Sequence, residues 1–118
     1  MKSGVIGRVP RISPTKGVSM DILGSGEKLT LVRIVAEPGA VIAEHSHPNE
    51  QIGTCVSGMG RLIVKGSQLK VEPGVCWIVE SNESHSFIAE GGVSCVLVEA
   101  FSPPREDYLA MASRKESL

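Results

Sequence analysis

The chain has 118 residues, which is the length of one domain. Its formal net charge is −1, aromatic residues make up only 3% of it, and lysine and arginine form no run, so we expect no nucleic acid partner. The segment Met1–Arg8 lacks the apolar core of a secretory signal, and no apolar run approaches the ~20 residues needed to span a bilayer. We therefore expect a cytoplasmic protein that does not enter a membrane.

The first third of the chain predicts an arm followed by two strands. Residues 1–16 are polar and contain Pro10 and Pro14, so we expect a loose arm, or an edge strand that docks onto a neighbour. Val18–Leu23 is expected to form a strand that ends at a glycine-rich turn. Leu29–Ala36 alternates and is largely apolar on both faces, which is typical of a strand in a closed barrel or sandwich.

Proline and glycine mark the turns of the remaining chain. The tripeptides Glu37-Pro38-Gly39 and Glu72-Pro73-Gly74 each predict a β-turn. Between them, Gly60–Val71 alternates on both sides of Gly66-Ser67, which predicts a hairpin. Further strands are expected at Val75–Val79 and Val93–Phe101, and one or two helical turns at Arg105–Met111. Many short strands favour an all-β sandwich or jelly roll.

The histidines indicate a metal site. His45 and His47 are two residues apart, a spacing that puts both imidazoles on one face of a strand. Gln51 follows with an oxygen ligand, and His85 can complete the set from an adjacent strand. This donor set suits a divalent ion, and a mixed nitrogen and oxygen shell fits nickel, zinc, manganese, cobalt or iron. The alternative is a set of imidazoles that are solvated or hydrogen-bonded and hold no metal ion.

The spacing around these residues resembles that of the cupin family. Gly39-x5-His45-x-His47-x3-Gln51-x6-Gly58 resembles the first cupin motif, and Gly74-x5-Glu80-x-Asn82-x2-His85 resembles the second. The resemblance spans residues 29–101 and implies an all-β cupin jelly-roll β-barrel, the double-stranded β-helix, with a metal ion inside its wider mouth. It divides the chain into an N-terminal arm at 1–16, a barrel at 17–102 and a C-terminal, partly helical segment at 103–118.

Gln51 departs from the cupin pattern, in which a glutamate is usual at this ligand position. Glu50 lies one residue away and would face the other side of a strand. A shell of three histidines and one glutamine is neutral, so a bound ion keeps its full double charge. That charge strengthens Lewis acidity and the binding of anions.

The segment Glu99–Leu109 resembles the tail of the small KdgF-type cupins, which open the ring of 4,5-unsaturated uronates in pectin and alginate breakdown. Their tail carries a carboxylate, a phenylalanine and an arginine at the spacing of Glu99, Phe101 and Arg105, although the carboxylate is normally an aspartate. The resemblance implies that these three residues are catalytic. The metal ion and Arg105 would bind the carboxylate and ring oxygens, Phe101 would pack against the sugar, and Glu99 would move protons.

Glu99 and Arg105 each have an alternative interpretation. Glu99 shares an apolar strand face with Cys95, Leu97 and Phe101, where a carboxylate is unfavourable unless it is paired or functional. It either points at the metal ion or lies at the barrel rim, paired with Arg105. Arg105 itself either clamps a substrate carboxylate or lies in solvent at the start of a helix.

The sequence thus predicts a metal-dependent isomerase that converts a small carboxylated sugar into 5-keto-4-deoxyuronate. An iron-dependent dioxygenase and a non-catalytic binding or sensor cupin are the alternatives, because one barrel hosts many chemistries. We also expect a homodimer, because strands that are apolar on both faces and an extended N-terminal arm offer surface to a second copy.

Overall fold

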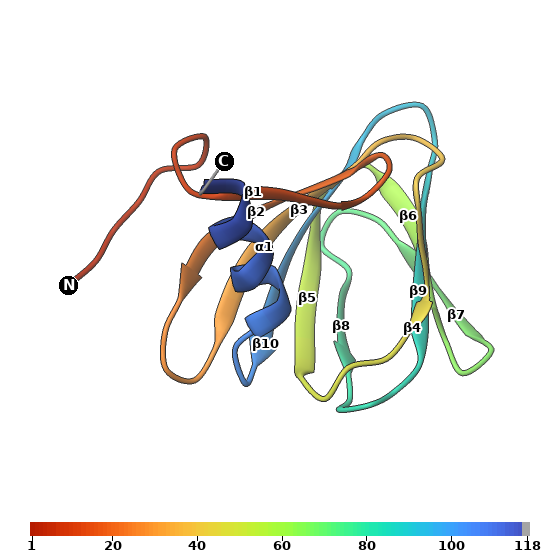
Figure 1. Ribbon diagram of the computed structural model, residues 1–118. Helices are drawn as coiled ribbons and strands as arrows, with labels where there is room; N and C mark the ends of the chain where they lie inside the picture. The colour runs from red at the N-terminus through yellow and green to blue at the C-terminus, as the bar shows by residue number, and fades with distance from the viewer. Residues whose placement is uncertain (117–118) are drawn as a thin grey trace.

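The polypeptide forms two antiparallel β-sheets that pack against each other. The structure is a computed structural model that describes residues 1–116 (Figure 1). The strands of this part of the chain are β1 (Arg11–Thr15), β2 (Val18–Ser25), β3 (Thr30–Ala36), β4 (Val41–His45), β5 (Glu50–Ser57), β6 (Met59–Val64), β7 (Ser67–Val71), β8 (Cys76–Val79), β9 (His85–Glu90) and β10 (Cys95–Ser102). A single helix, α1 (Glu106–Glu116), follows them within the described residues.

The sheets have the connectivity of a jelly roll. One sheet has the strand order β1-β2-β3-β10-β5-β8, and the other has the order β4-β9-β6-β7. From β3 to β10 the chain crosses to the other sheet at every connection except the β6–β7 hairpin. The expected all-β jelly roll with a C-terminal helix is confirmed, but the expected closed barrel is wrong. Among residues 1–116 no strand pairing joins the two sheets. The two layers are held together by the packing of their side chains.

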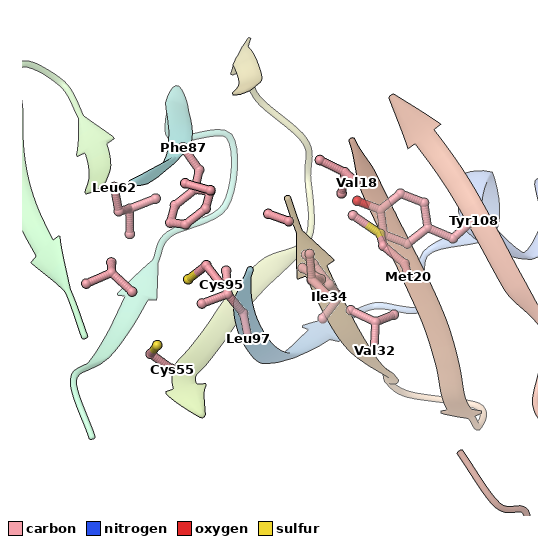
Figure 2. Close-up of a cluster of buried hydrophobic side chains, with 14 of the residues drawn as sticks. Val18, Met20, Val32, Ile34, Cys55, Leu62, Phe87, Cys95, Leu97 and Tyr108 are labelled. Carbon is pink, nitrogen blue, oxygen red and sulfur yellow. The ribbon is translucent and has the colours of Figure 1, made fainter. Parts of the chain in front are cut away.

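Alternating side chains build the core between the two sheets. Every second residue of β9 and β10 is buried, as their period of two requires. Leu62 and Phe87 of the four-stranded sheet face Leu97 of the six-stranded sheet (Figure 2). Each such side chain stabilises the fold by about 1.5–3 kcal/mol when it is fully buried.

The first strand and the C-terminal helix contact each other at the edge of the six-stranded sheet. β1 lies within the arm expected at 1–16 and pairs with β2 as the edge strand of the chain's own sheet. Helix α1 contacts β1 (Figure 1) and continues beyond Met111, where the expected one or two turns end. Glu106 and Asp107 in its first turn favour its N-terminus. The boundaries expected for the arm, the barrel and the C-terminal segment stay a prediction. No helix in the described part of the chain is long and apolar enough to cross a membrane.

A cross-strand row of charged residues links β1 to β2 and β3. Arg11, Asp21 and Arg33 lie opposite one another on β1, β2 and β3. Arg11 donates hydrogen bonds of 2.8 and 3.2 Å to the two carboxylate oxygens of Asp21, and Arg33 donates one of 3.3 Å. Asp21 is only 1% exposed. Its hydrogen bonds from Arg11 hold the pKa of its carboxyl below the usual value.

We expect Asp21→Asn to lower the free energy of unfolding by about 1.5–3 kcal/mol, because hydrogen bonds to a charged acceptor are lost. The folded pKa lies below the unfolded value of about 3.9, so this stabilisation is present above about pH 4. It is lost as the pH falls through the folded pKa. Urea unfolding at neutral pH and below about pH 3 measures both effects.

The control for this prediction is Glu72→Gln, which makes the same chemical change on a half-exposed carboxylate. It should shift the free energy of unfolding by less than about 0.5 kcal/mol. If the difference in the free energy of unfolding between wild type and Asp21→Asn stays constant from neutral to acid pH, the prediction is contradicted.

Candidate metal centre and its cavity

Three histidines converge between the two sheets. β4 and β9 pair so that His45 lies directly opposite His85. His47 follows β4, and its ring centroid lies 5.6 Å from that of His45 and 4.9 Å from that of His85. One ring nitrogen from each histidine lies within 4.8 Å of the other two. This separation allows a single ion to contact all three rings.

The hydrogen bonds of the three imidazoles determine which nitrogen faces the centre. In each ring Nδ1 lies 2.8–3.0 Å from a backbone carbonyl oxygen. The pairs are His45 with Ala43, His47 with Asn49, and His85 with Glu83. A carbonyl only accepts, so a neutral imidazole carries its proton on Nδ1 and keeps the lone pair of Nε2 for another partner. Backbone carbonyls commonly orient metal-ligating histidines in this way.

Gln51 adds an oxygen to the same centre. Its Nε2 donates a hydrogen bond to Oε2 of Glu99. Because a carboxylate accepts, this contact turns the amide so that Oε1 faces the histidines, 3.0 Å from Nε2 of His47. Two lone pairs therefore face each other at His47 and Gln51, an arrangement that a shared cation stabilises. Burial also lowers the pKa of His47 and His85, which keeps both imidazoles neutral. The donor set fits a divalent metal ion.

The route by which His47 reaches this centre differs from the prediction. β4 ends at His45, so His47 does not share a strand face with it. His47 lies in the turn before β5, where Ser81 donates a hydrogen bond of 2.6 Å to the carbonyl of Pro48. Ser46 and His47 lie outside any strand, and the chain then bends at Pro48-Asn49 before β5 begins. The predicted alternation of Glu50 and Gln51 is confirmed, since Glu50 is exposed and Gln51 is buried.

Glu99 is buried in the wall of the same cavity. It lies on β10 and is 5% exposed. Its Oε2 accepts hydrogen bonds from Gln51 and from Nε1 of Trp77, the latter over 3.0 Å. Burial raises the pKa of the Glu99 carboxyl, while both hydrogen bonds and the charge of Arg105 oppose that rise. Within residues 1–116 no ion pair joins Glu99 to Arg105, so the alternative of a rim position paired with Arg105 is wrong.

Arg105 is buried in the wall of the cavity that two of the histidines line and does not lie in solvent. Its Nε and Nη2 donate hydrogen bonds of 2.9 and 2.8 Å to the carboxylate of Asp107. Its guanidinium lies 4.7 Å from the centroid of the Phe101 ring and 3.8 Å from that of Tyr108. The remaining nitrogen, Nη1, is buried and has no hydrogen-bond partner within the described residues. A buried guanidinium nitrogen without an acceptor is unfavourable, so this atom is suited to an anionic ligand.

One cavity between the sheets contains nearly all of these groups. Its lining residues are Met20, Ile34, Ile42, His45, Gln51, His85, Phe87, Leu97, Glu99, Phe101, Arg105 and Tyr108. The structure therefore brings six of the seven predicted site residues to its wall. The seventh, His47, contacts Gln51 and packs edge-on against Phe101, with 5.7 Å between the ring centroids.

Three residues of this region were missed by the sequence analysis. Asp107 orients Arg105, and Tyr108 stacks on it and lines the cavity. Tyr108 lies three residues after Arg105 at the start of a helix, and this spacing was a usable signal because such pairs share a helix face. Trp77 is a buried residue of β8, and its hydrogen bond to Glu99 was not predicted.

The comparisons with known proteins agree with this fold. The family model Cupin_2, described as Cupin domain, matches residues 32–101. The pectin degradation protein KdgF of Dickeya dadantii (strain 3937) is 27% identical over 96 residues, which cover 79% of this chain and 84% of that protein.

Two solved structures show the same fold. KdgF from Halomonas sp. superimposes with a TM-score of 0.82 at 24% identity, over 92% of this chain and 98% of that one. An RmlC-like cupin from Shewanella frigidimarina NCIMB 400 has a TM-score of 0.83 at 23% identity, over 92% and 96% of the two chains. With the matched family model covering more than half of its length, the chain belongs to the cupin family and resembles KdgF within it.

Proposed function

We propose that the protein is a metal-dependent isomerase that opens the ring of 4,5-unsaturated uronates. The observation that carries this proposal is the chemistry gathered in one cavity. A cluster suited to a divalent cation lies beside the buried acid Glu99 and beside Arg105, whose Nη1 has no partner within residues 1–116. A sugar acid needs all three. Arg105 would serve its carboxylate, the cation its ring oxygen, and Glu99 the proton that moves during the reaction.

Arg105 would bind the carboxylate of the substrate. Asp107 occupies its Nε and Nη2, so the guanidinium is held in one orientation and offers only Nη1 to the cavity. The rings of Phe101 and Tyr108 flank it and keep it from solvent. A charge-assisted hydrogen bond formed in such a site is stronger and more selective than one formed in water. A flat, unsaturated ring would lie against Phe101.

Glu99 would move the proton of the reaction. Ring opening removes the proton of the anomeric hydroxyl and breaks the bond between C1 and the ring oxygen, which leaves an aldehyde at C1 and an enol at C5. The enol becomes a ketone as C4 gains a proton, so the reaction is an isomerisation with no atom lost. A buried carboxyl with a raised pKa suits both proton removal and delivery near neutral pH. A bound divalent ion would supply Lewis acidity at the substrate oxygens.

The resemblance to KdgF supports the substrate class. The name of the Dickeya dadantii relative assigns that protein to pectin degradation. Pectin is a polymer of uronates, and its cleavage by elimination leaves 4,5-unsaturated ends. Glu99, Phe101 and Arg105 also keep the spacing of the KdgF-type tail in this chain and lie together in the cavity.

The test is a turnover assay with unsaturated galacturonate. Metal-loaded protein should remove the ultraviolet absorbance of the conjugated double bond faster than the spontaneous reaction does, and chelation should abolish the acceleration. Dissolved oxygen should stay constant, which separates this reaction from that of a dioxygenase. A metal-loaded protein that gives no acceleration would overturn the proposal and favour a binding or sensor role.

Arg105→Lys should lower kcat/KM for the uronate by about 10–100-fold, because lysine keeps the charge and loses the planar, Asp107-oriented donor. Most of the loss should appear in KM if Arg105 binds the substrate carboxylate equally in the ground and transition states. Arg61→Lys makes the same change on a half-exposed arginine paired with Glu90 and should leave the kinetics unchanged. Equal kcat/KM for wild type and Arg105→Lys would remove the carboxylate clamp from the proposal.

A further inference from the structure

Trp77 reaches the Glu99 carboxylate across an intervening strand. Trp77 on β8, Gly53 on β5 and Glu99 on β10 form one cross-strand row. A Cβ atom on Gly53 would lie 2.7 Å from Nε1 of Trp77 and 2.9 Å from Cγ of Glu99, which is closer than real contacts allow. The missing side chain of Gly53 is therefore what allows the indole and the carboxylate to meet.

The hydrogen bonds to Glu99 leave its two oxygens in different situations. Both donors, Nε1 of Trp77 and Nε2 of Gln51, reach Oε2. Oε1 accepts no hydrogen bond from residues 1–116, and Glu99 lines the cavity together with Arg105. One carboxylate oxygen is thus held by the protein while the other remains available to a ligand.

We propose that Trp77 is a positioning residue for the reaction, acting through its indole N–H on Glu99, and that Gly53 is the position that makes this contact possible. The inference rests on the proposed function, because it concerns the carboxylate assigned to proton transfer. The N–H holds Oε2 from β8, so the carboxylate keeps one orientation and presents Oε1 to the substrate. A proton-transfer group displaced by about 1 Å can lose on the order of 100-fold in rate.

Trp77 is the sole tryptophan of the chain, so its side chain can be altered selectively and its fluorescence observed alone. Biosynthetic replacement with β-(3-benzothienyl)alanine substitutes sulfur for the N–H and preserves the bicyclic shape. Replacement with 5-fluorotryptophan preserves the N–H. The first protein should lose about 10–100-fold in kcat with KM within about twofold of wild type, and the second should recover most of the rate.

A pair of glycine substitutions tests the same contact from β5. Gly53→Ala should push Trp77 away from Glu99 and lower kcat to a similar extent. Gly24→Ala is the matched control, because Gly24 lies on β2 and a Cβ there meets nothing within 4 Å. Thermal unfolding of every protein separates a loss of kcat from a loss of folded material. A decrease in rate that only follows the folded fraction would assign Trp77 a structural role and overturn the inference.

Fluorescence tests the contact without turnover. Excitation moves electron density of an indole from the pyrrole ring toward the benzene ring, so a negative charge beside Nε1 shifts the emission to longer wavelength. Glu99→Gln should therefore shift the Trp77 emission to shorter wavelength. An unchanged spectrum would overturn the inferred contact.

The two proposals fail in different ways. Wild-type protein that does not turn over the uronate overturns the proposed function and the kinetic role of Trp77 with it. Wild-type protein that turns it over, with an unchanged kcat after benzothienylalanine replacement, overturns only the role of Trp77. A selective loss of kcat that 5-fluorotryptophan restores supports both.

Discussion

Glu99→Gln should lower kcat for the unsaturated uronate by about 10²–10⁴-fold, the range that one general acid or base contributes. Glutamine nearly matches glutamate in shape, and its carbonyl oxygen can still accept the hydrogen bond from Trp77. Its amide does not act as an acid or a base near neutral pH, so the chemical function is removed while the packing stays. KM should change little if Glu99 acts only on the moving proton. Steady-state kinetics on the metal-loaded variant measures both constants.

Glu50→Gln is the matched control for this experiment. Glu50 lies on the neighbouring strand β5, one residue before Gln51, and its side chain is exposed. The variant should keep wild-type kinetics and metal affinity, because the strand turns this carboxylate away from the cavity. A Glu99→Gln protein that keeps the wild-type kcat would move proton transfer to another group.

His85→Ala should weaken the binding of a divalent ion such as Zn²⁺ or Ni²⁺ by at least about 100-fold, because one of three converging nitrogen ligands is removed. Its turnover should fall to that of chelator-treated wild type. The backbone contacts of His85 are those of β9 with β4 and β6, and an alanine preserves them. Isothermal titration with the metal ion measures the affinity directly, with no substrate present.

Ser86→Ala is the control on the same strand. Ser86 follows His85, and its side chain lies on the opposite face of β9. Its metal affinity should equal that of wild type. Tight binding of one equivalent of metal by His85→Ala would show that the ion is held elsewhere and would remove the histidine cluster from the proposed mechanism.

Local pattern in the sequence determined most of the strands and the turns between them. Leu29–Ala36 and Val93–Phe101 predict β3 and β10, because a period of two depends only on neighbours along the chain. Gly39 and Gly74 adopt the positive φ angles, 82° and 90°, that their Pro-Gly turns require. The same periodicity placed Gln51 inward and Glu50 outward.

The spacing of a known family extended this prediction to the site. His45, His47, Gln51 and His85 were selected by their positions in two cupin-like motifs, and the structure places all four around one centre. The chemistry of Glu99, Phe101 and Arg105 was likewise taken from a resemblance. The structure places these residues in the same cavity, and their roles stay a prediction.

Only the tertiary structure decided how these residues are held. The contacts of Glu99 with Trp77 and Gln51 join positions 22 and 48 residues apart. Such contacts depend on which strands become neighbours and in which register, and no local pattern contains that information. The same applies to the two sheets that remain unjoined and to His47, which reaches the centre from a turn. The sequence by itself determined the strands and the candidate ligand residues. The tertiary structure decided which neighbouring groups orient the side chains of those residues.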